Sequence, residues 1–173
     1  MRRLAVLGAV LAVVLIVPFA AARLPGTDAQ EATPATGAGF TLEPLGGGPS
    51  TEAPGLGLGQ ARVTFAPGFA ETHRHVHPFD YVVVVESGSL AFTIEAGTLL
   101  LTRAGAAATP TAAEAVAPGT EATVGPGDSF AGNRDVVWAS ERVVGDEPFV
   151  ARAAFLGAPD APFATYLDGT PTP

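Results

Sequence analysis

Residues 71–90 read ETHRHVHPFDYVVVVESGSL and join a histidine-rich start to a β-branched run and a glycine turn. All three histidines of the chain fall here, at His73, His75 and His77. Because side chains alternate along a strand, a strand through these positions directs the three imidazoles to one face. The run Tyr81–Val85 is typical of a strand covered on both sides. The stretch therefore predicts a sheet with a row of imidazoles on one face.

Alternating apolar and polar positions extend from this stretch through about Gln60 to Gly157 and predict further short strands. No segment there keeps a 3.6-residue apolar period for the three or four turns of a helix. Residues 104–117 are alanine-rich, but Pro110 and Pro118 interrupt them, which indicates a long loop or irregular insertion. Many short strands in about a hundred residues indicate an all-β sandwich or small barrel. The further strands are expected at 61–65, 89–95, 98–102, 121–124, 136–139 and 148–156.

The first 22 residues have the pattern of an export signal. Arg2 and Arg3 precede an uncharged apolar run over 4–22, which contains Pro18 and ends in three alanines. Two interpretations remain: a cleaved signal peptide, or an uncleaved anchor close to the roughly 20 residues that span a bilayer. Both predict an exported protein, extracellular or at the cell surface, and only the uncleaved form would be anchored in a membrane, through residues 4–22.

The rest of the chain divides by composition into three parts. Residues 23–58 are rich in Pro, Gly and Thr and predict a disordered linker, and residues 159–173 predict a flexible tail. The barrel is expected over 59–158. Within the linker, Phe40, Leu42 and Leu45 allow a different interpretation, an extra strand on the barrel.

Charge and cysteine content exclude several classes of function. The 173 residues carry 9 Arg, no Lys and 17 acidic residues, a net charge of −8, so a nucleic-acid binder with its basic footprint is excluded. The absence of cysteine excludes disulfides, thiolate metal sites and cysteine nucleophiles. Arginine without lysine, beside abundant Ala, Gly and Pro, indicates a bacterial genome of high GC content.

The histidine row has the spacing of a metal site built on a sheet. Imidazoles at i and i+2 can both reach one divalent ion about 2.0–2.2 Å from each nitrogen. We expect His73, His75 and His77 to supply ligands, with Glu71 as the first carboxylate candidate and Asp80 or Glu86 as others. The alternative is a solvated polar edge without a metal.

The same stretch resembles the first motif of the cupin superfamily, whose members fold as jelly-roll β-barrels. That motif holds a Gly, a His-x-His pair, a Glu three or four residues later and a second Gly. Reading back from Gly88 places the pair at His75 and His77 and the Glu position at Tyr81. Gly68 lies one residue further from the pair than the motif asks. The resemblance implies a cupin-like double-stranded β-helix.

The second cupin motif is matched less well. Counting from Gly127, its Pro and Gly positions fall on Asn133 and Asp135, its His position on Trp138 and its Asn position on Arg142. In a metal-bearing cupin, the ion is held by both histidines of the first motif, the Glu and the His of the second motif. By this resemblance, Tyr81 and Trp138 replace two of the four ligands, and tryptophan cannot ligate a metal.

The resemblance implies a pocket lined by His75, His77, Tyr81 and Trp138 that suits a small, partly apolar ligand. Our preferred hypothesis is an exported, non-catalytic domain that binds a small molecule or a partner. The alternative is a metal-dependent enzyme of the dioxygenase or isomerase type that uses His73, His75 and His77. The resemblance also implies a homodimer. No catalytic residue is assigned from the sequence.

Overall fold

The computed structural model describes residues 35–37, 39–105 and 112–168. The predicted signal or anchor segment, 1–22, lies outside the described residues, as do the start of the predicted linker and the last residues of the predicted tail. No helix that could span a membrane occurs in the described part of the chain.

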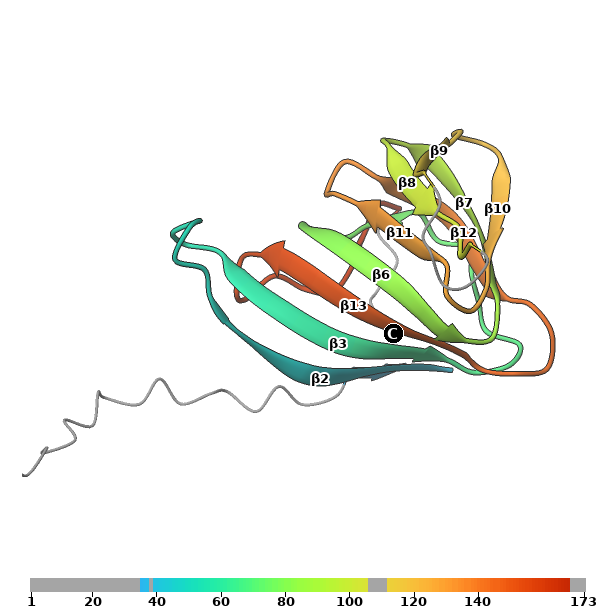
Figure 1. Cartoon of the computed structure of the whole chain (residues 1–173), viewed down its shortest axis with the longest axis horizontal. Coiled ribbons are helices and arrows are strands. Elements are labelled where there is room, and N and C mark those ends of the chain that lie inside the picture. Colours follow the sequence, from blue (N-terminus) through green and yellow to red (C-terminus); the bar gives the residue numbers. More distant parts are fainter. Residues whose placement is uncertain (1–34, 38, 106–111, 169–173) are drawn as a thin grey trace, which may run out of the picture. The chain divides into compact units, whose positions relative to one another are not determined.

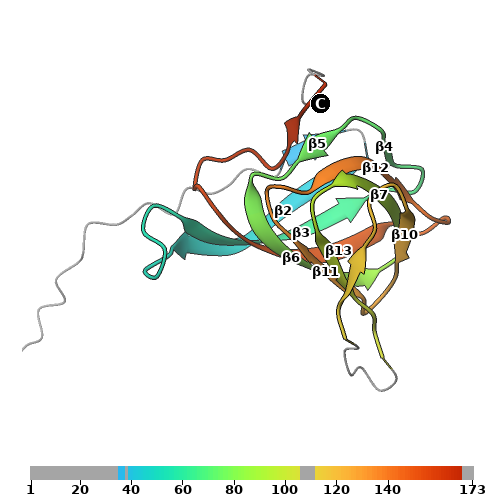
Figure 2. The ribbon, with the colours of Figure 1, turned by 90° about the horizontal axis from the view of Figure 1, so that it is seen from above.

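The described residues form strands in two antiparallel sheets, which confirms the all-β prediction. The larger sheet runs in the order β1-β2-β3-β13-β6-β11-β8-β9, and its middle can be followed in Figure 1. The smaller sheet runs β10-β7-β12-β5-β14, with β4 also paired to β12, and Figure 2 shows β7 between β10 and β12. The strands are β1 (Ala35–Gly37), β2 (Phe40–Pro49), β3 (Gly57–Phe65), β4 (Ala70–Glu71), β5 (His75–Val76), β6 (Phe79–Ser87), β7 (Leu90–Ala96), β8 (Leu99–Thr102), β9 (Glu114–Val116), β10 (Glu121–Val124), β11 (Ser129–Gly132), β12 (Val137–Val143), β13 (Phe149–Gly157) and β14 (Thr165–Tyr166).

The hydrophobic core lies between the two sheets, because the inward residues of both belong to one cluster. Val63 and Phe149 enter it from the larger sheet, and Phe92, Ile94 and Trp138 from the smaller one. Buried and more exposed residues alternate over 92–95 of β7 and 149–154 of β13, as the period of a strand requires, whereas Ala91 of β7 is buried as well. The period of two thus predicted which side chains build this core.

Gly88, the glycine at the end of the first cupin-like motif, is required by close packing. Its backbone has a φ of 70°, which side chains disfavour. A Cβ at this position would also collide with the main chain at Pro148 and Phe149. The turn between β6 and β7 therefore accepts only glycine without rearrangement.

Three regions expected to be loose are ordered in part. Strand β2 lies within the predicted linker and pairs with β3 along nearly its whole length. Its Phe40 packs on Phe65 and Phe163, with ring centroids 5.6 and 5.5 Å away. The predicted loop 104–117 contains β9, paired to β8, and the predicted tail contains β14, paired to β5. In each case an open sheet edge supplies hydrogen bonds that composition does not reveal.

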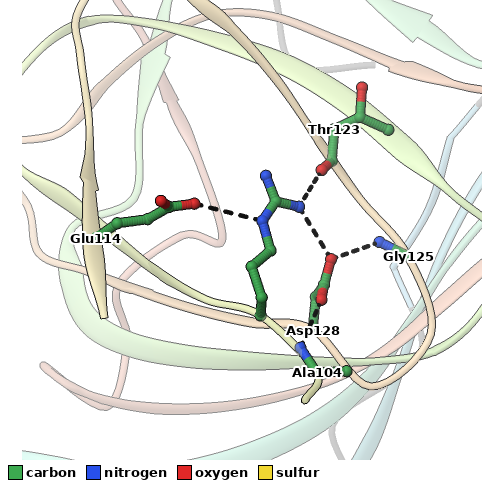
Figure 3. Close-up of polar contacts among 6 residues, drawn as sticks. Ala104, Glu114, Thr123, Gly125 and Asp128 are labelled. Atoms are coloured by element: carbon green, nitrogen blue, oxygen red, sulfur yellow. Dashed lines mark hydrogen bonds and ion pairs between the residues drawn. The ribbon is translucent and has the colours of Figure 1, made fainter. Parts of the chain in front are cut away.

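A polar cluster holds β8 to the turn before β11, and Figure 3 shows it. The Asp128 carboxylate accepts hydrogen bonds from the main-chain N–H of Ala104 (2.8 Å) and Gly125 (3.1 Å) and from the Arg103 guanidinium (3.0 Å). Arg103 also donates to the Thr123 carbonyl and forms an ion pair with Glu114 at 3.4 Å. This arrangement fixes the turn that the sequence Gly125–Asp128 predicted.

Candidate metal centre and its cavity

A cavity of about 260 Å³ opens between the sheets on the side of β5. Much of its lining is aromatic, with phenylalanines at positions 40, 65, 69, 149 and 163. The lining also includes the polar side chains of His75, His77, Glu141, Glu71 and Tyr166. A small molecule with both apolar and polar groups matches this mixed lining.

His75 and His77 both lie in this cavity, as the alternation predicted. They are 3% and 9% exposed, and their ring centroids are 5.3 Å apart. His75 belongs to β5, where it pairs with Trp138 of β12 on one side and with Tyr166 of β14 on the other. The short strand β5 therefore fixes His75 from both edges.

Each of the two imidazoles uses Nδ1 for a main-chain carbonyl. The Nδ1 atom of His75 lies 3.0 Å from the His73 carbonyl oxygen, and that of His77 lies 2.6 Å from the Phe163 carbonyl oxygen. A carbonyl only accepts, so Nδ1 must carry the proton in both rings. The lone pair of each imidazole is then on Nε2, which is the arrangement that orients histidine ligands in metal sites.

His73 does not join the other two histidines. The chain leaves the sheet between β4 and β5, so the alternation that includes His73 is interrupted. Its side chain is 47% exposed, and its Nδ1 lies 2.7 Å from Oε1 of Glu71. The other carboxylate oxygen of Glu71 accepts a hydrogen bond from the Tyr166 hydroxyl at 3.0 Å. The structure thus places His73 and Glu71, two of the predicted ligands, in a pair at the rim.

Glu141, which the sequence reasoning did not name, takes the place of a carboxylate ligand. One ligand atom each from His75, His77 and Glu141 lies within 4.8 Å of the other two. Glu141 is 8% exposed, and among the described residues no donor hydrogen-bonds to its carboxylate. Its remaining exposure is toward the cavity that it lines.

A β-bulge explains why Glu141 points inward. The register between β12 and β7 shifts at Trp138 and again between Trp138 and Ser140. Strict alternation from Trp138 would direct Ser140 and Arg142 inward and Glu141 outward. The extra residue reverses this order, because a bulge places two residues opposite one on the partner strand. No pattern in the sequence marks the bulge.

The buried position of these groups changes their protonation. Burial lowers the pKa of His77 to about 4, despite the hydrogen bond to Phe163, and His75 lowers it further. Burial raises the pKa of Glu141, and the nearby His75 partly offsets that rise. Glu71, which pairs with Glu141 between β4 and β12, raises the pKa of Glu141 further. Burial raises the pKa of Tyr166 to about 12, and its bond to Glu71 contributes. At neutral pH His77 is therefore an uncharged ligand.

The donor set fits a divalent transition-metal ion. Two imidazole nitrogens and one carboxylate oxygen form the combination found in sites that leave coordination positions open. Two ligands bound at up to about 2.2 Å lie no more than about 4.4 Å apart, so these atoms, all within 4.8 Å of one another, need to move by at most a few tenths of an ångström to bind one ion. Among the described residues that line the cavity there are two carboxylates and no arginine, which also favours a cation.

Tyr81 and Trp138 lie beside this group but face each other. The indole Nε1–H donates to the Tyr81 hydroxyl at 3.1 Å, and both residues are almost fully buried. Burial raises the pKa of Tyr81 above its usual range. These two residues stand at the positions where the resemblance expects a Glu and a His, and their mutual hydrogen bond occupies both. They form the floor of the cavity.

Comparison with known proteins gives a fold likeness at low identity. No family model matches this sequence, and no curated protein matches it. Among solved structures, the chain is similar to oxalate decarboxylase from Lactobacillus farciminis (13% identity, TM-score 0.47) and from Bacillus subtilis (21% identity, TM-score 0.48). It covers 33% and 30% of those two chains with 79% and 80% of its own length, so it spans about a third of each.

A smaller protein also matches. The KdgF protein from Halomonas sp. is 16% identical, with a TM-score of 0.46, and the match covers 72% of this chain and 86% of that one. All three of these matches lie below 25% identity and below a TM-score of 0.5.

Proposed function

We propose that this chain binds one divalent transition-metal ion through His75, His77 and Glu141, in a cavity that also takes a small, largely apolar ligand. The observation that supports this most is the combination of two imidazoles with their Nδ1 protons bound to carbonyls and a buried carboxylate without a donor. No fully buried side-chain oxygen among the described residues lacks a partner, so the Glu141 oxygens are accessible from the cavity. An ion at this position would take the place of solvent beside the carboxylate.

The side chains around the ion define what the site does. His75 and His77 present neutral lone pairs, Glu141 supplies the negative charge, and the surrounding phenylalanines make the space beside them largely apolar. An ion held by three protein ligands keeps open positions and supplies Lewis-acid chemistry to a bound molecule. The donor set favours Fe(II), Zn(II) or Ni(II) over Mg(II) or Ca(II), which prefer oxygen ligands.

Metal analysis tests this proposal directly. Protein purified without chelator is expected to contain one equivalent of a transition metal, and chelator-treated protein to take up one equivalent of Zn(II). His75→Ala, His77→Ala and Glu141→Ala should each weaken Zn(II) binding by more than about 100-fold, because removal of a ligand exceeds the usual effect of an outer residue. His73→Ala is the matched control and should bind as the unaltered protein does. Equal binding by all four variants would refute the proposed ligand set.

A second candidate function is binding of a small molecule without a metal. It is favoured by the Trp138–Tyr81 hydrogen bond, which leaves two of the four expected ligand positions without a ligand. Absence of metal uptake combined with retention of an aromatic ligand in the cavity would support this candidate. The preference for a non-catalytic domain stays a hypothesis, because the same cavity and ion serve a binding protein or an enzyme.

We propose in addition that the protein is exported, on the basis of Arg2, Arg3 and the apolar residues 4–22. N-terminal sequencing of protein recovered from the medium and from the membrane fraction tests this. A new N-terminus near Arg23 supports a cleaved signal peptide. Retention of Met1 in the cytoplasm would overturn export.

A further inference from the structure

The C-terminal strap, residues 158–168, lies along the strand that carries the metal ligand His75. Its strand β14 pairs with β5 through Thr165 with Val76 and Tyr166 with His75. The main-chain N–H of Leu167 donates to the Arg74 carbonyl at 2.8 Å, which extends this pairing by one bond. A segment that composition marks as a loose tail is therefore anchored to the site.

Within the described part of the chain, the hydrogen-bond acceptor of the His77 ring comes from the strap. The Nδ1–H group of His77 donates to the Phe163 carbonyl at 2.6 Å, and the two rings pack with centroids 4.8 Å apart. The acceptor is 86 residues away in sequence, whereas His75 donates to His73, only two residues away. Without the strap, nothing described holds the His77 proton on Nδ1 and its lone pair on the Nε2 side.

The strap also holds the second carboxylate of the cavity. The Tyr166 hydroxyl donates to Oε2 of Glu71, while His73 occupies Oε1 through its main-chain N–H and its ring. These bonds keep Glu71 at the rim, although it lies opposite Glu141 across the β4–β12 pair. Glu141 is then the carboxylate that stays open for an ion.

We infer that the C-terminal strap is a working part of the metal site: the Phe163 carbonyl fixes the ligand tautomer of His77, and Tyr166 holds Glu71 out of the ligand set. The expected effect on metal affinity rests on the proposed function. The contacts of the strap with His77 and Glu71 are observed in the structure. Phe163 and Tyr166 are positioning residues, since they act through His77 and Glu71.

A matched pair of variants loosens the strap without shortening the chain. Leu167→Pro removes the N–H that bonds to Arg74, whereas Leu167→Ala keeps it and alters only a half-exposed side chain. Zn(II) affinity, measured by competition with a chromophoric chelator, is expected to fall about 10-fold or more in Leu167→Pro, as for loss of other partners that orient ligands. Leu167→Ala and a chain ending at Asp168 should bind Zn(II) as the full chain does. Unchanged affinity in Leu167→Pro would overturn the inference.

A spectroscopic measurement on metal-free protein separates the role of the strap from the metal proposal. Long-range ¹H–¹⁵N correlation spectra of metal-free protein report which ring nitrogen of His77 carries the proton. We expect the proton on Nδ1 in the full chain and in Tyr166→Phe, and a mixture of tautomers in Leu167→Pro. A proton on Nε2 in the full chain refutes the strap's role. If the tautomers behave as expected and no metal binds, the strap's role stands and the metal proposal fails.

Discussion

Two largely buried carboxylates of this protein have opposite surroundings. Asp128 accepts bonds from two main-chain N–H groups and from Arg103, as Figure 3 shows, and these outweigh burial, so its pKa is lowered. Glu141 has no donor among the described residues, and burial raises its pKa. The comparison separates a carboxylate that holds the fold together from one that is kept open beside two imidazole lone pairs. The second has no protein donor among the described residues and stays accessible to an ion that enters the cavity.

The largest expected effect concerns Glu141. Glu141→Gln keeps the shape but removes the charge, so Zn(II) affinity should fall by more than about 100-fold while the metal-free protein unfolds at the same denaturant concentration or higher. Chelator competition and urea unfolding measure the two quantities. A variant that loses stability and keeps its metal affinity would show that Glu141 is structural.

The next effect concerns pH and His77. The pKa of His77 is about 4 in the folded protein against a usual value of 6.5, so the unfolded chain binds the extra proton between these values. The contribution of the neutral His77 to the free energy of unfolding is therefore complete above about pH 6.5. It falls by about 3 kcal/mol as the pH drops toward 4. Urea unfolding of metal-free protein across this range, with His77→Gln as reference, measures the difference. If the unfolding free energies of the two proteins changed with pH in the same way, the claim that His77 is buried and neutral would be contradicted.

Asp128 provides the matching structural test. Asp128→Asn removes the charge that Arg103 and two main-chain N–H groups share, and should lower the free energy of unfolding by about 2 kcal/mol. Because Asp128 lies away from the cavity lining, Zn(II) affinity should not change. A loss of metal affinity in this folded variant would remove the distinction between the two carboxylates.

The smallest effect concerns the floor of the cavity. Tyr81→Phe leaves the Trp138 indole N–H without its acceptor and should cost about 1–2 kcal/mol in unfolding free energy. Zn(II) affinity should stay the same, because the Tyr81 hydroxyl is hydrogen-bonded to Trp138 and is not one of the proposed ligands. A drop in affinity as large as that of Glu141→Gln would make Tyr81 a ligand.

The fold was largely predictable because one face of most strands is buried. The alternation around Phe92 and Ile94 and the glycine at 88 indicated strands and turns that the structure contains. The region of strand β2 was interpreted first as a linker and only alternatively as a strand, because its glycines are typical of linkers. Its order comes from pairing with β3. Pairing to a sheet edge is a long-range property that local composition does not encode.

The candidate site was predictable only in part. His75 and His77 follow from the His-x-His spacing, and the resemblance put Tyr81 and Trp138 beside them. Glu141 was missed because a bulge reverses the alternation, and Phe163 and Tyr166 because they lie in an apparently loose tail. His73 was included because the break in the sheet before β5 has no clear signal in the sequence.

Anomalous diffraction from crystals of Zn(II)-loaded protein tests the central claim most directly. We expect one strong peak about 2.0–2.2 Å from Nε2 of His75, Nε2 of His77 and a carboxylate oxygen of Glu141. A peak between His73 and Glu71 at the rim, or none in the cavity, would contradict it.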